Sequence, residues 1–208
     1  MPDGLTLAGM LLVLGPVVAA ASLAYPPMFR VWTVPREQHL ALIRTHRLAW
    51  TLISSGFTVA TVMTAAGLVV LAGAIPVGGG SRAVIAAAAV GYAIAGTLWC
   101  AVLAIRARTT PAFADMVAAG TPTEPAETVV GDALGGLFAA FILITGAALV
   151  AVALVLTATG VVAQPVGGLA AVIAAFAAVG FLAFGDMLPA VVYLPTELVG
   201  IAILLGWS

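Results

Sequence analysis

The chain has 208 residues, of which 63% are hydrophobic and only 7% are charged, and its formal net charge is −1. A soluble domain needs far more charged residues to cover its surface, so this composition excludes an ordinary soluble protein and predicts lipid as the surrounding solvent. The small net charge, without basic runs, gives no indication of binding to nucleic acid.

Six apolar stretches are candidates for membrane-spanning helices. A span needs about 20 apolar residues, and the backbone polar groups within lipid must be satisfied inside a helix. We therefore predict an all-α fold, a single polytopic transmembrane helical bundle over residues 1–208 with no separate soluble domain. The predicted spans are 5–24, 48–73, 83–105, 133–156, 169–184 and 188–206.

Basic residues are concentrated between the first two predicted spans. Aromatic residues beside Arg30 are typical of an anchor at the membrane–water interface. Residues 36–47 add more arginines, and we predict that this segment lies at the membrane surface. Arg36, Arg44 and Arg47 are candidates for contact with anionic lipid headgroups, at roughly 1 kcal/mol per arginine.

Metal and cofactor chemistry has little support in the sequence. His39 and His46 are seven residues apart, which separates them by roughly 10.5 Å along a helix, too far to share one metal ion. Cys100 is the only cysteine, so no cysteine-based metal site can form, and the absence of lysine excludes a Schiff-base cofactor. We therefore predict neither a metal nor a cofactor.

Small residues in the third span and around the start of the fourth are spaced for close helix packing. Gly131 and Gly135 form a pair four residues apart, as Gly91 does with Ala87 and Ala95. Helices in lipid approach closely where small residues recur at this spacing. A polar connection, residues 106–131, separates the two spans and is too short to fold independently.

The last predicted span depends on where it begins, because residues 198–207 alone would reach only about 15 Å as a helix. A helix over 188–206 crosses a bilayer if Asp186 caps it and Pro189 occupies its first turn. The alternative is five spans followed by a re-entrant or interfacial C-terminal segment that turns at Pro195.

Glu197 is the one obvious ionisable carboxylate within the six apolar stretches. A carboxylate inside the bilayer is costly and is a candidate functional group. Counted by depth along the predicted spans, four further polar residues fall near the bilayer middle. The candidate polar layer consists of Glu197, Thr58, Thr61, Tyr92 and Thr145. Ordinary packing between helices is the alternative explanation for its hydroxyl groups.

Arginine placement predicts the orientation. With the N-terminus outside, six of the seven arginines lie on the cytoplasmic side and only Arg82 lies outside, which follows the positive-inside rule. Lysine and asparagine, which have A-rich codons, are absent, and this bias is typical of a GC-rich bacterial genome. We predict a multi-pass protein of the bacterial inner (plasma) membrane with cytoplasmic arginine-rich loops.

Three functions fit these observations. The first is an accessory or structural component, without enzymatic activity, that contacts a membrane-protein partner or a second copy of itself through its helices. The second is a transporter or channel for a proton or small solute that uses the layer around Glu197. The third is a membrane enzyme acting on lipid, which would need polar groups such as His39, His46 and Asp186 to converge at the cytoplasmic interface.

Overall fold

The computed structural model describes residues 3–207, and of Trp32 only the backbone; within that range every regular element is a helix. Long α-helices alternate with short turns, and two 3₁₀ helices (η1 and η2) occur in the connections. The elements are α1 (Gly4–Ser22), η1 (Pro26–Trp32), α2 (Arg36–Thr45), α3 (Arg47–Ala74), α4 (Gly79–Ala118), α5 (Glu124–Ala158), α6 (Gln164–Phe184), η2 (Pro189–Tyr193) and α7 (Leu194–Leu205).

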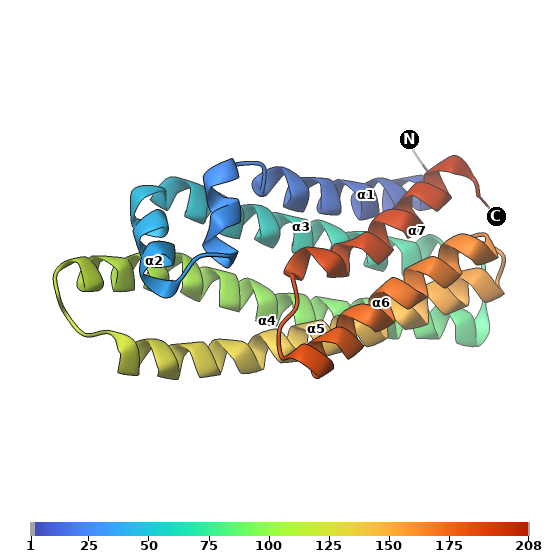
Figure 1. Cartoon of the computed structure of the whole chain (residues 1–208). Helices are drawn as coiled ribbons and strands as arrows, with labels where there is room; N and C mark the ends of the chain where they lie inside the picture. The colour runs from blue at the N-terminus through green and yellow to red at the C-terminus, as the bar shows by residue number, and fades with distance from the viewer. Residues whose placement is uncertain (1–2, 208) are drawn as a thin grey trace.

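Five of these helices, α1, α3, α4, α5 and α6, are long and apolar enough to cross a membrane. They lie side by side in one elongated bundle, and both chain termini are at the same end of it (Figure 1). The fold is therefore a helical membrane bundle, as predicted from hydropathy and length, and the protein crosses the membrane several times.

Two helices extend well beyond a bilayer. The 40 residues of α4 and the 35 of α5 correspond to roughly 60 and 52 Å, against about 30 Å for the hydrocarbon core. The predicted polar connection 106–131 is therefore mostly helical, and only residues 119–123 form the turn. The apolar part of α4 ends at Arg106 and that of α5 begins after Asp132, but both helices extend beyond these charged residues.

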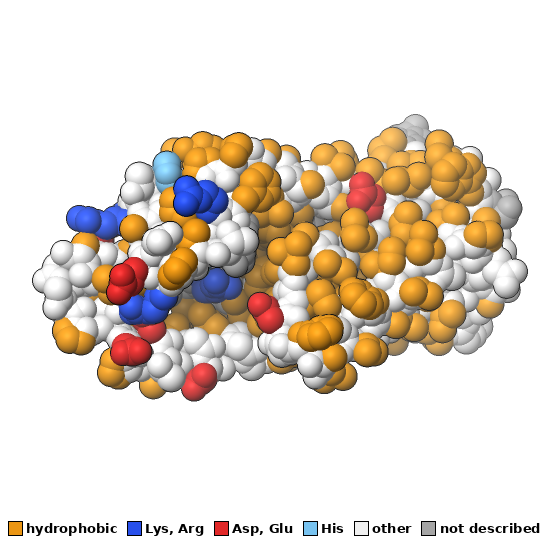
Figure 2. Space-filling view, in the orientation of Figure 1, with side chains coloured by type: hydrophobic (Ala, Val, Ile, Leu, Met, Phe, Trp, Pro, Cys, Tyr) orange, Lys and Arg blue, Asp and Glu red, His pale blue; other side chains and the backbone are white. Residues whose placement is uncertain are grey.

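Charged side chains gather around this helical extension. We call the region formed by η1, α2, the first turns of α3 and the adjoining ends of α4 and α5 the charged end. Figure 2 shows most of the visible basic and acidic side chains at the left, over this region, whereas hydrophobic side chains cover the right half. Both chain termini lie at the opposite end of the bundle (Figure 1).

The C-terminal segment differs from the predicted continuous helix over 188–206. It consists of η2 followed by α7, whose 12 residues span roughly 18 Å. Proline at the start of each element explains the break, because proline favours a first helical turn and cannot continue the preceding one. Helix α7 begins about halfway along the bundle and returns to the end that holds the N-terminus (Figure 1).

Glycine allows the closest helix approaches. A Cβ atom built on Gly15 in α1 would lie 2.6 Å from the Thr64 hydroxyl and 2.9 Å from the Ala60 carbonyl oxygen in α3. A Cβ on Gly200 in α7 would lie 2.9 Å from the carbonyl oxygen of Gly9 in α1. Without a hydrophobic force between helices in lipid, such close contacts are a main source of bundle stability.

The glycines that spacing alone indicates as packing positions are not at these contacts. A Cβ on Gly131 or Gly135 would meet no atom within 4 Å, and one on Gly91 would meet only an ordinary contact at 3.8 Å. The predicted close packing at Gly131 and Gly135 is therefore wrong. Both glycines instead line a cavity.

Candidate functional site: a cavity at the charged end

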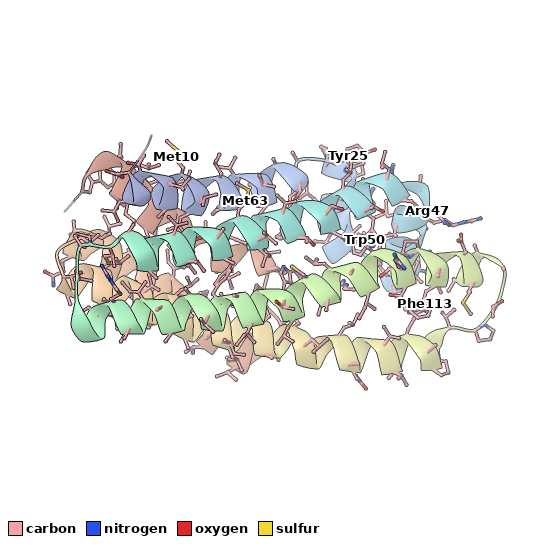
Figure 3. All side chains as sticks on the ribbon, turned by 180° about the vertical axis from the view of Figure 1, so that it is seen from behind. Met10, Tyr25, Arg47, Trp50, Met63 and Phe113 are labelled. Atoms are coloured by element: carbon pink, nitrogen blue, oxygen red, sulfur yellow. The ribbon has the colours of Figure 1, made fainter. Side chains whose placement is uncertain are left out.

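A cavity of about 670 Å³ lies at the charged end between α2, α4, α5 and the segment that joins α6 to η2. Figure 2 shows the surface hollowed where the charged left end meets the apolar right half. In the reverse view of Figure 3, Trp50 and Phe113 lie at this same end of the molecule, far from Met10. The cavity thus lies where the protein passes from apolar to polar surroundings.

Apolar side chains form one part of the wall. Trp99 and Val102 from α4, Leu134 and Phe138 from α5, and Leu188 line it. Residues three or four apart share a helix face, which is why α4 and α5 each contribute a row of side chains. Trp99 is fixed by stacking on Phe141, with ring centroids 5.2 Å apart, and its buried indole nitrogen has no hydrogen-bond partner among the described residues.

Arg106 supplies the cationic part of the wall. Its guanidinium lies 5.7 Å from the ring centroid of Trp50, a cation–π arrangement, and the Trp50 indole donates to the Arg106 carbonyl oxygen at 3.2 Å. The side chain is half-buried. Among residues 3–207, no carboxylate oxygen lies within 4 Å of its guanidinium. Arg106 is thus a positioned cation in a partly desolvated place without an ion-pair partner.

Asp186 contributes an acidic group to the same cavity. It follows Gly185, which ends α6 in the left-handed conformation with φ 71°. One oxygen of the Asp186 carboxylate accepts a hydrogen bond from the backbone N–H of Met187 at 2.8 Å. The other oxygen has no partner within the described part of the chain.

Arg36 and Glu127 join α2 to α5 at the cavity. The guanidinium donates to both Glu127 oxygens, at 2.8 Å from Nε to Oε2, and also to the Thr123 hydroxyl at 2.8 Å. These hydrogen bonds from Arg36 lower the pKa of Glu127 from its ordinary value of 4.5, because they favour the ionised carboxylate. The two charges compensate each other, so this pair adds no net charge to the cavity.

His39, on α2, is a neutral member of the wall near pH 7. Burial lowers the pKa of the imidazole from 6.5, a hydrogen bond between Nδ1 and the Val31 carbonyl oxygen at 2.8 Å opposes the shift, and the Arg106 charge adds to the lowering. Because the imidazole is uncharged at pH 7, Arg106 is the unpaired cation that faces the cavity.

The residues proposed for lipid and enzyme chemistry are distributed over different places. Arg44 and Arg47 both pair with Asp115 on α4, and Arg36 pairs with Glu127. Of the three polar residues that a lipid-acting enzyme would use, the cavity brings together His39 and Asp186. His46 lies instead in a second cavity of about 710 Å³ between the end of α1 and the start of α3.

Within the described residues, no hydrogen bond joins two members of the candidate polar layer. The buried Thr61 hydroxyl bonds to the Tyr193 hydroxyl at 2.7 Å and to the Phe57 carbonyl oxygen of its own helix. Among the described residues, the Thr58 hydroxyl bonds only to the preceding turn of α3, through the Ser54 carbonyl oxygen at 2.9 Å.

The other three members of the layer are separate. Tyr92 and Thr145 are fully buried, and neither hydroxyl has a hydrogen-bond partner in the part of the chain that the structure describes. Glu197 is half-buried in the first turn of α7, and it forms no hydrogen bond to Thr61, Tyr92 or Thr145. A site that combines Glu197 with these hydroxyls remains a prediction.

Three residues of this region are not indicated by the sequence. Local sequence presents Arg106 only as the basic end of a span, and Trp99 as an apolar residue. Tyr193 lies in the stretch whose boundaries are hardest to define. Trp99 and Arg106 are seven residues apart and therefore share one face of α4. This spacing could have linked the two residues, but it does not indicate which residues of other helices lie opposite them.

Comparison of the chain with protein-family models, with curated proteins and with solved structures finds no match. Its class therefore follows from its own composition and fold: five long apolar helices define a multi-pass helical membrane protein.

Proposed function

We propose that this protein binds a phosphate-bearing amphiphile, such as a membrane phospholipid, in the charged-end cavity. The observation that carries the proposal is Arg106, a half-buried cation without an ion-pair partner among the described residues, which faces a largely apolar cavity. A cation held in such surroundings is matched by an anionic group, and phosphate is an acceptor that a guanidinium binds strongly.

The other residues that line the cavity suit the polar headgroup and the acyl chain of a phospholipid. Thr110 lies near Arg106 on α4 and offers a hydroxyl donor, while the Thr109 hydroxyl already donates to the Ile105 carbonyl oxygen. Trp99, Leu134 and Phe138 form an apolar path. Ligand sites are commonly apolar clefts of about 300–1,000 Å³ with a few placed polar groups. The volume of about 670 Å³ accommodates a headgroup and the first part of an acyl chain.

The proposal includes a location. Six of the seven arginines lie in η1, α2, the start of α3 and the second half of α4, toward the charged end, and only Arg82 lies near the opposite end. The positive-inside rule then places the charged end in the cytoplasm and both termini outside, for a protein of a bacterial plasma membrane. The ligand would come from the cytoplasmic leaflet.

Replacing Arg106 by glutamine tests the site. We expect the fraction of protein that retains phospholipid to fall by about tenfold or more, because a hydrogen bond to a charged group contributes about 1.5–3 kcal/mol and each 1.4 kcal/mol is tenfold in affinity. The measurement is native mass spectrometry after release from nanodiscs that contain phosphatidylethanolamine and phosphatidylglycerol in equal amounts.

The matched control is Arg108→Gln, which removes an exposed arginine from the same helix but outside the cavity. Because Arg106 also packs on Trp50, the thermal unfolding of each variant is recorded in parallel. Equal lipid retention by the Arg106 and Arg108 variants would contradict the proposal.

Filling the cavity provides a test that leaves every charge in place. Gly135 lines the cavity, whereas its neighbour Gly136 does not, and a Cβ atom at either position would meet no other atom within 4 Å. We expect Gly135→Leu to lower lipid retention several-fold and Gly136→Leu to leave it unchanged. If the two leucine variants retain lipid equally, the ligand is not in this cavity.

A reaction on the bound lipid is a second candidate because His39 and Asp186 line the same cavity, and it would be detected as altered lipid masses in the same samples. The accessory role and transport through Glu197 stay predictions from the sequence, since no contact in the structure adds to either.

A further inference from the structure

Two positive and two negative side chains line the cavity, so their charges sum to zero. One positive and one negative side chain among them form no ion pair with any described residue. Arg36 and Glu127 neutralise each other through direct hydrogen bonds. Arg106 and Asp186 both line the cavity. No ion pair joins them within residues 3–207, so their nitrogen and oxygen atoms are more than 4 Å apart.

On the basis of the lipid site proposed above, we infer that its ligand has a zwitterionic head in which a phosphate faces Arg106 and a primary ammonium group faces Asp186. Phosphoethanolamine, the head of phosphatidylethanolamine, is the common membrane headgroup with this chemistry. Both side chains border the same cavity of about 670 Å³, so one ligand in it can contact both.

A net anionic head fits the cavity less well. Phosphatidylglycerol would gain the same contact with Arg106, but its glycerol would leave the Asp186 carboxylate without a cationic partner. Asp186 is exposed, so water screens part of its interactions, but it would still repel the phosphate because like charges at short range are unfavourable. His39 does not alter this balance, since burial and the Arg106 charge lower its pKa and leave the imidazole neutral near pH 7.

The carboxylate also distinguishes between zwitterions. Asp186 has one oxygen occupied by the Met187 backbone N–H and one that can accept a further hydrogen bond. A primary ammonium donates three hydrogen bonds, as the lysine side chain does, whereas the quaternary nitrogen of choline has no N–H to donate. Phosphatidylethanolamine is therefore expected to bind more tightly than phosphatidylcholine.

The test is a competition between three phospholipids with identical acyl chains. The full-length protein is released from nanodiscs that contain phosphatidylethanolamine, phosphatidylglycerol and phosphatidylcholine in equal amounts, and the retained lipid is identified by native mass spectrometry. We expect phosphatidylethanolamine to exceed each of the others by about fivefold or more. In Asp186→Asn, whose amide oxygen can still accept from Met187, we expect this preference to fall to near unity, with phospholipid still retained.

Asp132→Asn is the control, because Asp132 is an exposed acid on α5 that does not line the cavity, and it should keep the preference. Equal retention of the three lipids by the unaltered protein, or an unchanged preference in Asp186→Asn, would overturn the zwitterion inference and leave the lipid site standing. Failure to find any retention that depends on Arg106 would overturn both.

Discussion

Gly15→Ala should clearly destabilise the protein, although it adds only one methyl group. The added Cβ atom would lie 2.6 Å from the Thr64 hydroxyl and 2.9 Å from the Ala60 carbonyl oxygen, so α1 and α3 must move apart. Overpacking of this kind costs about 1–3 kcal/mol. The measurement is the midpoint of thermal unfolding in detergent, followed by circular dichroism.

Gly136→Ala is the matched control, because Gly136 also lies inside a helix but a Cβ atom there meets nothing within 4 Å. Alanine is a better helix former than glycine by roughly 1 kcal/mol, so this variant should be as stable as the unaltered protein or slightly more stable. If Gly15→Ala proves as stable as Gly136→Ala, α1 and α3 do not cross at Gly15.

Glu127→Gln should both loosen α2 from α5 and change the response of stability to acid. The ionised carboxylate accepts two hydrogen bonds from Arg36, and glutamine removes its charge. Because the Arg36 side chain is 46% exposed and that of Glu127 20%, solvent screening limits the expected loss to about 1 kcal/mol near pH 7.

The pH dependence follows from the direction of the pKa shift. The folded-state pKa of Glu127 lies below its ordinary value of 4.5, so its ionised form contributes stability that is present above that pH and is lost as the pH falls through the lowered pKa. Denaturation of the unaltered protein and of Glu127→Gln should therefore differ at pH 7 and converge in strong acid, where protonated glutamate resembles glutamine.

Two other carboxylates bear on this measurement. Asp115, whose pKa is also lowered by its hydrogen bond with Arg47, is present in both proteins, so its effect cancels in the difference. Glu124→Gln removes an exposed carboxylate three residues earlier on α5 and should follow the unaltered protein. A constant difference between Glu127→Gln and the unaltered protein from neutral pH to strong acid would contradict the role given to the Arg36–Glu127 pair.

The residues of the cavity show why the site is harder to predict than the helices. Arg36 and Glu127 are 91 positions apart and Arg47 and Asp115 are 68 apart, so nothing local indicates that these charges pair. The same pairing engages Arg36, Arg44 and Arg47, which the sequence alone presents as candidates for lipid contact. Arg106, which local sequence does not set apart from Arg108, has no ion-pair partner in the described chain.

The amino-acid sequence by itself determined that this is a multi-pass helical membrane protein, because long apolar runs can satisfy their backbone only as helices in lipid. It also placed the charged residues around the connections between spans. Only the tertiary structure decided that α4 and α5 continue as helices beyond the apolar region, that Gly131 and Gly135 border a cavity, and that Arg106 and Asp186 line it together. Those outcomes depend on which helix faces meet and how closely they pack. Hydropathy along the chain does not carry this information, because it is set by contacts between residues far apart in the sequence.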